Sequence, residues 1–94
     1  MNIHNKHKIY WACRRGIREL EIFIIFFFKY EYDSLTKNEK YLFVRLLECT
    51  DIDLLDWLTN SKRPDNDDFY NMIQLIKNKN NQRNFLKKNT NLFN

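Results

Sequence analysis

Glycine and proline are almost absent from this chain of 94 residues, which contains one of each, Gly16 and Pro64. An all-β domain needs a turn every ~8–12 residues, and most turns depend on these residue types. The scarcity therefore argues against an all-β fold and excludes collagen-like and loop-dominated chains. Apolar residues recur instead at intervals of three and four, which is the spacing of amphipathic helices. The sequence predicts an all-α protein.

Five helical segments are expected, and together they should form a small five-helix bundle with a single domain. They span approximately residues 4–14, 17–32, 36–47, 51–58 and 65–76. Thr36 and Glu39 have the spacing of a capping box at the start of the third segment. Asp51 is the expected N-cap of the fourth segment, and Asp65 or Asp67 that of the fifth.

Asparagine and lysine dominate the last part of the chain. Seven of the thirteen asparagines lie at or after position 78, where apolar residues are few. Such a segment buries too little apolar surface to offset the conformational entropy that it loses on ordering. We therefore expect a helical domain over residues 1–78 and a flexible tail, frayed or disordered, over residues 79–94.

The cysteines and the apolar segments bear on the compartment. Cys13 and Cys49 cannot form a disulfide framework. We expect no secretory leader before them, and we expect both to be small buried side chains. The longest unbroken apolar run, residues 22–28, has seven residues, whereas a bilayer span needs about 18. We expect a cytoplasmic protein that does not insert into membranes.

Charge is distributed unevenly along the chain. Residues 1–18 carry five bases and no acid, residues 19–68 carry six bases and twelve acids, and residues 69–94 carry five bases and no acid. A basic N-terminal segment fits nucleic acid, an anionic ligand or an acidic protein surface. Tyr10 and Trp11 could stack on bases, but the acidic middle and the lack of a known nucleic-acid signature argue against that partner.

No pattern typical of an active site is present. The sequence has no glycine-rich phosphate loop, no CxxC pair and no HExxH motif. His4 and His7 lie three residues apart with Cys13 nearby, which is fewer than the roughly four ligands of a zinc site. We expect no enzymatic activity, no metal and no tightly bound cofactor.

The densest cluster of functional side chains lies between the first and second helical segments, where Arg14, Arg15, Gly16, Arg18 and Glu19 follow one another closely. Arginine binds carboxylates and phosphates with its planar fork, and a glycine lets a partner's backbone approach. The glycine is also expected to terminate the first helix with a positive φ. The residues alone leave a binding site and an ordinary capped helix end equally open.

One face of the second helical segment carries Glu19, Ile22 and Phe26 at positions i, i+3 and i+7, opposite its core-facing stripe. Two arrangements are compatible with this pattern. The helix could be central and covered on both sides, or it could expose apolar surface beside a carboxylate.

The segment from Trp11 to Glu21, WACRRGIRELE, resembles the signature of the succinate dehydrogenase assembly factor family, which comprises the bacterial SdhE/YgfY proteins and their mitochondrial relatives. The likeness covers about residues 8–76 in the correct order. Its further matches are Phe28, Tyr32, Leu35, Thr36, Glu39, Phe43, Leu46, Leu47, Asp51, Asp53, Leu54, Trp57 and Leu58. The chain departs from the family pattern at Ile17, where methionine is usual, and at Glu21, where aspartate is usual.

This resemblance implies a five-helix bundle that binds the flavoprotein subunit of succinate dehydrogenase, and of fumarate reductase in some bacteria. The family promotes covalent attachment of FAD to a histidine of that subunit. Its RGxxE motif falls on Arg15, Gly16 and Glu19. Antitoxin-like roles have also been attributed to family members, and they form the weaker interpretation.

We therefore predict a non-enzymatic assembly factor or chaperone for the flavoprotein subunit. Its partner-binding residues are expected to be Arg15, Gly16 and Glu19, supported by Trp11, Arg14, Arg18, Ile22 and Phe26. FAD is expected on the partner rather than on this chain. The alternative is a small basic regulatory protein, antitoxin-like or nucleic-acid-binding. A monomer and a weak dimer both remain open.

Overall fold

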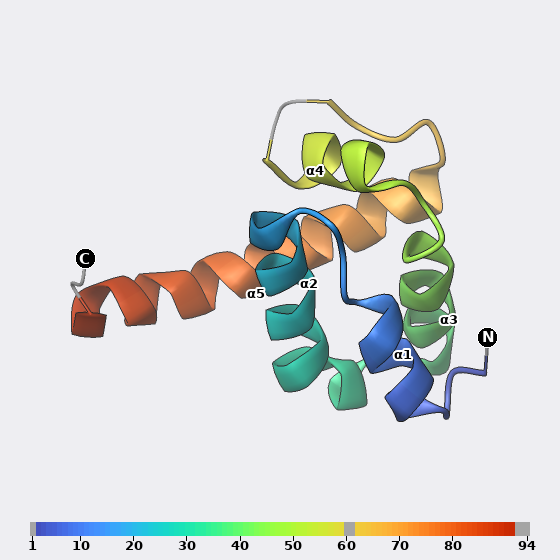
Figure 1. The fold of residues 1–94 in the computed structure, drawn as a ribbon, viewed down its shortest axis with the longest axis horizontal. Helices are drawn as coiled ribbons and strands as arrows, with labels where there is room; N and C mark the ends of the chain where they lie inside the picture. The colour runs from blue at the N-terminus through green and yellow to red at the C-terminus, as the bar shows by residue number, and fades with distance from the viewer. Residues whose placement is uncertain (1, 60–61, 92–94) are drawn as a thin grey trace.

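The computed structural model describes residues 2–59 and 62–91, with side chains as far as residue 82. Over these residues the chain forms five α-helices and one short 3₁₀-helix, and no strand. The helices are α1 (Lys6–Ala12), α2 (Arg18–Glu31), α3 (Lys37–Leu46), α4 (Asp51–Thr59) and α5 (Asp67–Asn91), with the 3₁₀-helix η1 at Tyr32–Ser34. The predicted all-α fold is confirmed (Figure 1).

Helix α5 is the longest element and packs against α2, α3 and α4 (Figure 1). Helix α4 lies across the upper end of the bundle in this view, and α1 lies beside α3 at the lower right. The connection from α1 to α2 crosses the near face of the molecule. None of the described helices is long and apolar enough to span a bilayer.

The core is formed by the helical stripes that the apolar spacing predicts. The largest fully buried side chains include a group of aromatic rings, in which Phe27 and Tyr32 both lie within 6 Å of Phe43 between ring centroids. Short helix α1 is attached to this core through Ile9 and Cys13, which have no exposed surface. Burial of these side chains fixes the place of α1, because a helix of seven residues has little stability of its own.

The capping box of the third helix is confirmed, and the N-cap of the fourth is corrected. The Thr36 hydroxyl accepts the N–H of Glu39, whose carboxylate accepts the N–H of Thr36. In α4 the cap is Thr50, whose hydroxyl accepts the N–H of Asp53 at 3.2 Å, and not Asp51. Asp51 already belongs to the helix, and its carboxylate bonds elsewhere.

The N-cap of the fifth helix is also corrected, from Asp65 or Asp67 to Asn66. The Asn66 side-chain oxygen accepts the N–H of Phe69 at 3.0 Å. The side-chain oxygen of an asparagine caps a helix as well as that of an aspartate, so the sequence offered three adjacent candidates. The aspartates still contribute negative charge at the positive end of the helix dipole.

Helix α5 continues well beyond the expected end near residue 76. Asn80, which is only 1% exposed, donates its side-chain amide to the backbone carbonyl of Phe23 in α2 at 2.9 Å. The packed domain therefore extends at least to Asn80. A flexible tail over 79–94 stays a prediction, and residues 92–94 lie outside the described part of the chain.

Candidate functional site

Gly16 lies in the connection between α1 and α2, but it does not terminate α1 as expected. The helix ends at Ala12 with Cys13 as its C-cap, and Gly16 does not adopt a left-handed φ. A Cβ atom at this position would lie 3.4 Å from a carboxylate oxygen of Asp51, which is ordinary contact. Neither backbone strain nor a clash with Asp51 therefore requires glycine here, and Gly16 contributes an exposed stretch of backbone without a side chain.

The side chain of Arg15 is turned into the bundle and is only 12% exposed. Its Nε donates to the Asp51 carboxylate at 2.7 Å. Its Nη1 donates to the carbonyls of Ala12 and Leu47, both at 2.9 Å, and its Nη2 to that of Cys49 at 2.8 Å. One guanidinium thus satisfies carbonyls at the end of α1 and in the turn between α3 and α4, which otherwise lack helical partners.

Two carboxylates hold the backbone of the connection. The second oxygen of Asp51 accepts the N–H of Gly16 at 3.0 Å. Glu21, from the first turns of α2, accepts the N–H of Arg15 at 2.8 Å and the Nε of Arg14 at 3.1 Å. The hydrogen bond from the Arg15 side chain, with a further one from the Gly16 backbone, keeps the pKa of Asp51 below its usual value.

Outside this bonded centre, Trp11 and Arg14 form an exposed aromatic and cationic pair. The Trp11 side chain is 55% exposed, and its ring N–H donates to His7 at 3.3 Å. The Arg14 guanidinium carbon lies 5.4 Å from the centre of the indole ring, within the range of a cation–π interaction. Tyr10 meets the same indole edge-on at 6.0 Å.

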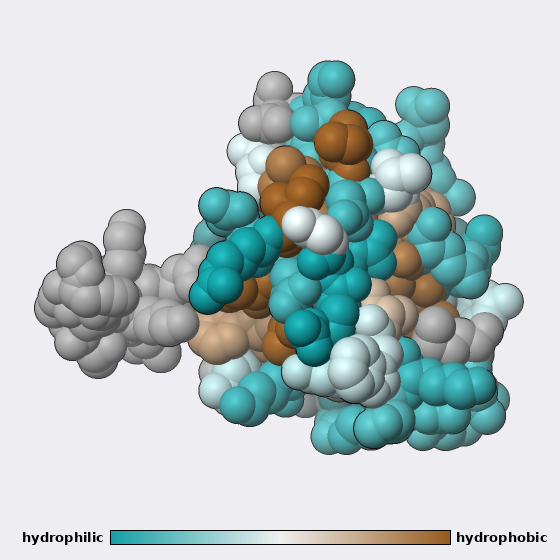
Figure 2. Space-filling model, in the orientation of Figure 1, coloured by the Kyte–Doolittle hydropathy of each residue, from teal (hydrophilic) through white to brown (hydrophobic). Residues whose placement is uncertain are grey.

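The outer face of α2 shows that this helix is not covered on both sides. Arg18 and Glu19 are exposed, and Ile22 is 52% exposed. Phe26, one turn further, is half-buried and meets Tyr30 edge-on at 5.1 Å between ring centroids. In Figure 2, hydrophilic side chains cover much of this view, and apolar patches interrupt them along α2 and over α4.

The structure places the eight predicted site residues on α1, on α2 and on the connection between them, but their side chains differ in exposure. Arg15 is enclosed, and Phe26 is half-buried. The remaining six are exposed: Trp11, Arg14, Gly16, Arg18, Glu19 and Ile22. The sequence interpretation missed Asp51 as a part of this site, because it assigned that carboxylate to a helix cap. The only signal in the sequence was its place in the family likeness.

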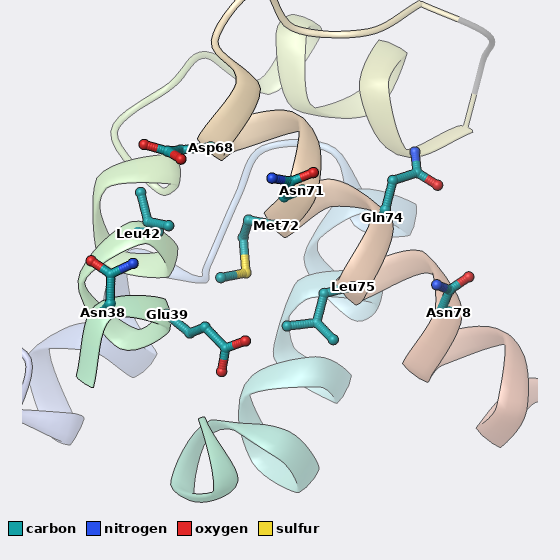
Figure 3. Close-up of a pocket in the computed structure, with 9 residues that line it drawn as sticks. All are labelled: Asn38, Glu39, Leu42, Asp68, Asn71, Met72, Gln74, Leu75 and Asn78. Atoms are coloured by element: carbon teal, nitrogen blue, oxygen red, sulfur yellow. The ribbon is translucent and has the colours of Figure 1, made fainter. Parts of the chain in front are cut away.

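Elsewhere, the described side chains include no cluster of three or more histidine, cysteine or acidic residues that could hold a metal ion. A groove of about 430 Å³ lies between α3 and α5 (Figure 3). Leu42 of α3 and Met72 and Leu75 of α5 line it, with amide and carboxylate side chains around them. None of the eight predicted residues lines this groove.

Fold and site together define a small all-α domain with an exposed surface built around an arginine-centred helix connection. Residues 7–80 match the family described as flavinator of succinate dehydrogenase, and the chain belongs to this family. It is 57% identical over 83 residues to the FAD assembly factor SdhE of Photorhabdus laumondii, a match that covers 88% of this chain and 94% of that protein. The proteins of the same name from Yersinia pseudotuberculosis and a Serratia species are 55% and 47% identical, with the same coverage. The resemblance noted in the sequence is confirmed.

Proposed function

We propose that this protein is an assembly factor that binds the flavoprotein subunit of succinate dehydrogenase and promotes covalent attachment of FAD to it. Family membership and the name that the relatives share support the cofactor and the enzyme. The observation that carries the proposal for this chain is the exposed surface around Gly16, which is attached to the core by the bonds of Arg15.

Six exposed residues, Trp11, Arg14, Gly16, Arg18, Glu19 and Ile22, form this docking surface. Trp11 and Ile22 supply apolar area, and the charged side chains set the register against the partner. Gly16 lets the partner's backbone approach closely, since it has no side chain. Phe26 extends the surface at its edge.

The proposed mechanism is non-enzymatic. Flavin chemistry resides in FAD and in the partner that holds it, and no cofactor is bound tightly by this chain. The protein acts by binding most strongly to the conformation of the partner in which attachment occurs, because a ligand shifts an equilibrium only by its differential affinity. We further propose fumarate reductase as a second partner, a cytoplasmic location, and a monomer or weak dimer.

Co-expression with the flavoprotein subunit tests the proposal, with covalent flavin measured by its fluorescence on a denaturing gel. Glu19→Ala should slow flavin attachment and leave the helical content unchanged, because Glu19 is exposed. Tyr41→Ala is the matched control, since Tyr41 is 54% exposed on α3. Attachment at the normal rate with Glu19→Ala, or without any assembly factor, would contradict the assignment.

Internal ion pairs weigh against nucleic acid as the partner. Three of the five bases in residues 1–18 are already paired with carboxylates: Lys6 with Asp33 at 2.8 Å, Arg14 with Glu21 at 3.1 Å, and Arg15 with Asp51 at 2.7 Å. Fewer cations are then available to phosphates. A salt titration separates the two partners, because phosphate-dominated binding weakens steeply and log-linearly with salt.

A further inference from the structure

We propose that Asp51 is a positioning residue for the docking surface. Arg15 has the same role: it acts from inside the bundle and does not contact the partner. The inference rests on the proposed function and goes beyond it, because neither the RGxxE motif nor the exposed surface includes Asp51. The two side chains form one bonded unit that joins the α1–α2 connection to α3 and α4.

The first step is that Arg15 has little left to offer a partner. An arginine side chain has five N–H donors. Four of these are used by Asp51 and by three backbone carbonyls, at 2.7 to 2.9 Å. The side chain is also only 12% exposed. A partner carboxylate therefore could not form a bidentate ion pair with Arg15 without breaking these hydrogen bonds.

The second step is that Asp51 fixes the direction of the exposed backbone. One carboxylate oxygen holds Arg15 and the other holds the N–H of Gly16 at 3.0 Å. Gly16 precedes the start of α2 by two residues and Glu19 by three. The orientation of the Gly16 peptide therefore determines how Arg18 and Glu19 are presented relative to Trp11.

The third step is that α2 also holds the α1–α2 connection, through a hydrogen bond to Glu21. Glu21 accepts the N–H of Arg15, so two successive backbone N–H groups bond to carboxylates of two different helices. Such a connection is ordered before the partner arrives. Preorganisation favours affinity, because less conformational freedom is lost on binding.

Gly16 provides a specific probe, because it is the only glycine in the chain. Protein labelled with ¹⁵N-glycine gives one backbone amide signal in an NMR spectrum. Asp51→Asn removes the charge and leaves one accepting oxygen for two donors, the Arg15 side chain and the Gly16 N–H. We therefore expect the amide chemical shift of Gly16 to change. The matched control is Asp53→Asn, which removes the same charge from an exposed position in the same turn of α4.

The second measurement is affinity for the isolated flavoprotein subunit. Asp51→Asn should weaken binding roughly tenfold, and Asp53→Asn should not, because only the first disturbs the docking surface. Arg15→Lys keeps the charge but loses the planar fork, and it should weaken binding to a similar degree. The two losses should not add in the double variant, because both substitutions break the same unit.

The outcomes separate the possible roles. If Asp51→Asn weakens binding but leaves the Gly16 amide signal in place, Asp51 contacts the partner directly. If the signal shifts but the affinity is unchanged, Asp51 matters only for the fold. Either result overturns the inference and leaves the proposed function intact. Should Asp51→Asn fail to fold, Arg15→Lys with unchanged affinity overturns it equally. A wild-type protein that does not bind the subunit overturns the proposed function and the inference together.

Discussion

Replacement of Arg15 by alanine should destabilise this protein far more than replacement of a surface arginine. The guanidinium donates one hydrogen bond to Asp51 and three to the carbonyls of Ala12, Leu47 and Cys49. Because the donor is a cation, all four bonds are charge-assisted, and a hydrogen bond to a charged group contributes about 1.5–3 kcal/mol. Because water can reach part of the vacated site and recover some of these bonds, we expect a loss of roughly 3–4 kcal/mol.

Such a loss is a large share of the total, since a domain of this length is stable by roughly 5–14 kcal/mol. Urea unfolding followed by far-UV circular dichroism measures it directly. With a slope on the order of 1 kcal/mol per molar urea, the midpoint should fall by roughly 3 M. Arg18→Ala is the control, because Arg18 is exposed on the first turn of α2 and should change stability by about 0.5 kcal/mol or less. Equal midpoints for the two variants would refute the reasoning.

Acid should reduce the difference in stability between wild type and Arg15→Ala by the part that depends on the Asp51 carboxylate. The hydrogen bond from Arg15 is the largest cause that lowers the pKa of Asp51 in the folded protein. A carboxyl with a lowered pKa stabilises the fold above its unfolded-state pKa, and this contribution is lost as the pH falls through the folded-state value. The difference in stability between the two proteins should therefore become smaller in strongly acidic solution but not vanish, because the hydrogen bonds from Arg15 to the three backbone carbonyls do not titrate. A constant difference down to the acid limit would contradict the assignment of the pair.

Three further predictions concern the rest of the bundle. Thr36→Ala should lower the unfolding free energy by about 1 kcal/mol in a urea titration, because it removes the capping box of α3; no change would exclude that contribution. Burial raises the pKa of the Cys13 thiol to about 12, so it should resist a thiol reagent at neutral pH until the protein unfolds. Asn80→Asp should lower the melting temperature clearly, because a buried carboxylate would replace the amide that donates to the Phe23 carbonyl. An unchanged melting curve would show that the Asn80 side chain is not enclosed.

Most of the secondary structure was accessible from the sequence, because it depends on neighbours along the chain. The apolar spacing placed Leu20, Ile24 and Phe27 on one buried stripe of α2, and the three-residue spacing of Thr36 and Glu39 identified the start of α3. Helix ends were less certain, since adjacent polar residues can each cap a helix with a side-chain oxygen.

The sequence indicated a candidate site at the α1–α2 connection, which stays a prediction, but the environment of its residues was not accessible from the sequence. Nothing in the local sequence distinguishes Arg15, whose side chain is enclosed, from Arg14, whose side chain is 46% exposed. The distinction arises from Asp51, which is 36 residues away and belongs to another helix.

Amino-acid sequence alone thus determined the helices, the core-facing stripes and the cluster of charged residues at the α1–α2 connection. Tertiary structure decided which members of that cluster face the solvent, and it decided the contact of Asn80 with Phe23 across 57 positions. The physical reason is that amphipathic spacing is a property of a single helix, whereas the partner of a hydrogen-bonding group depends on which helix ends the packed core brings together.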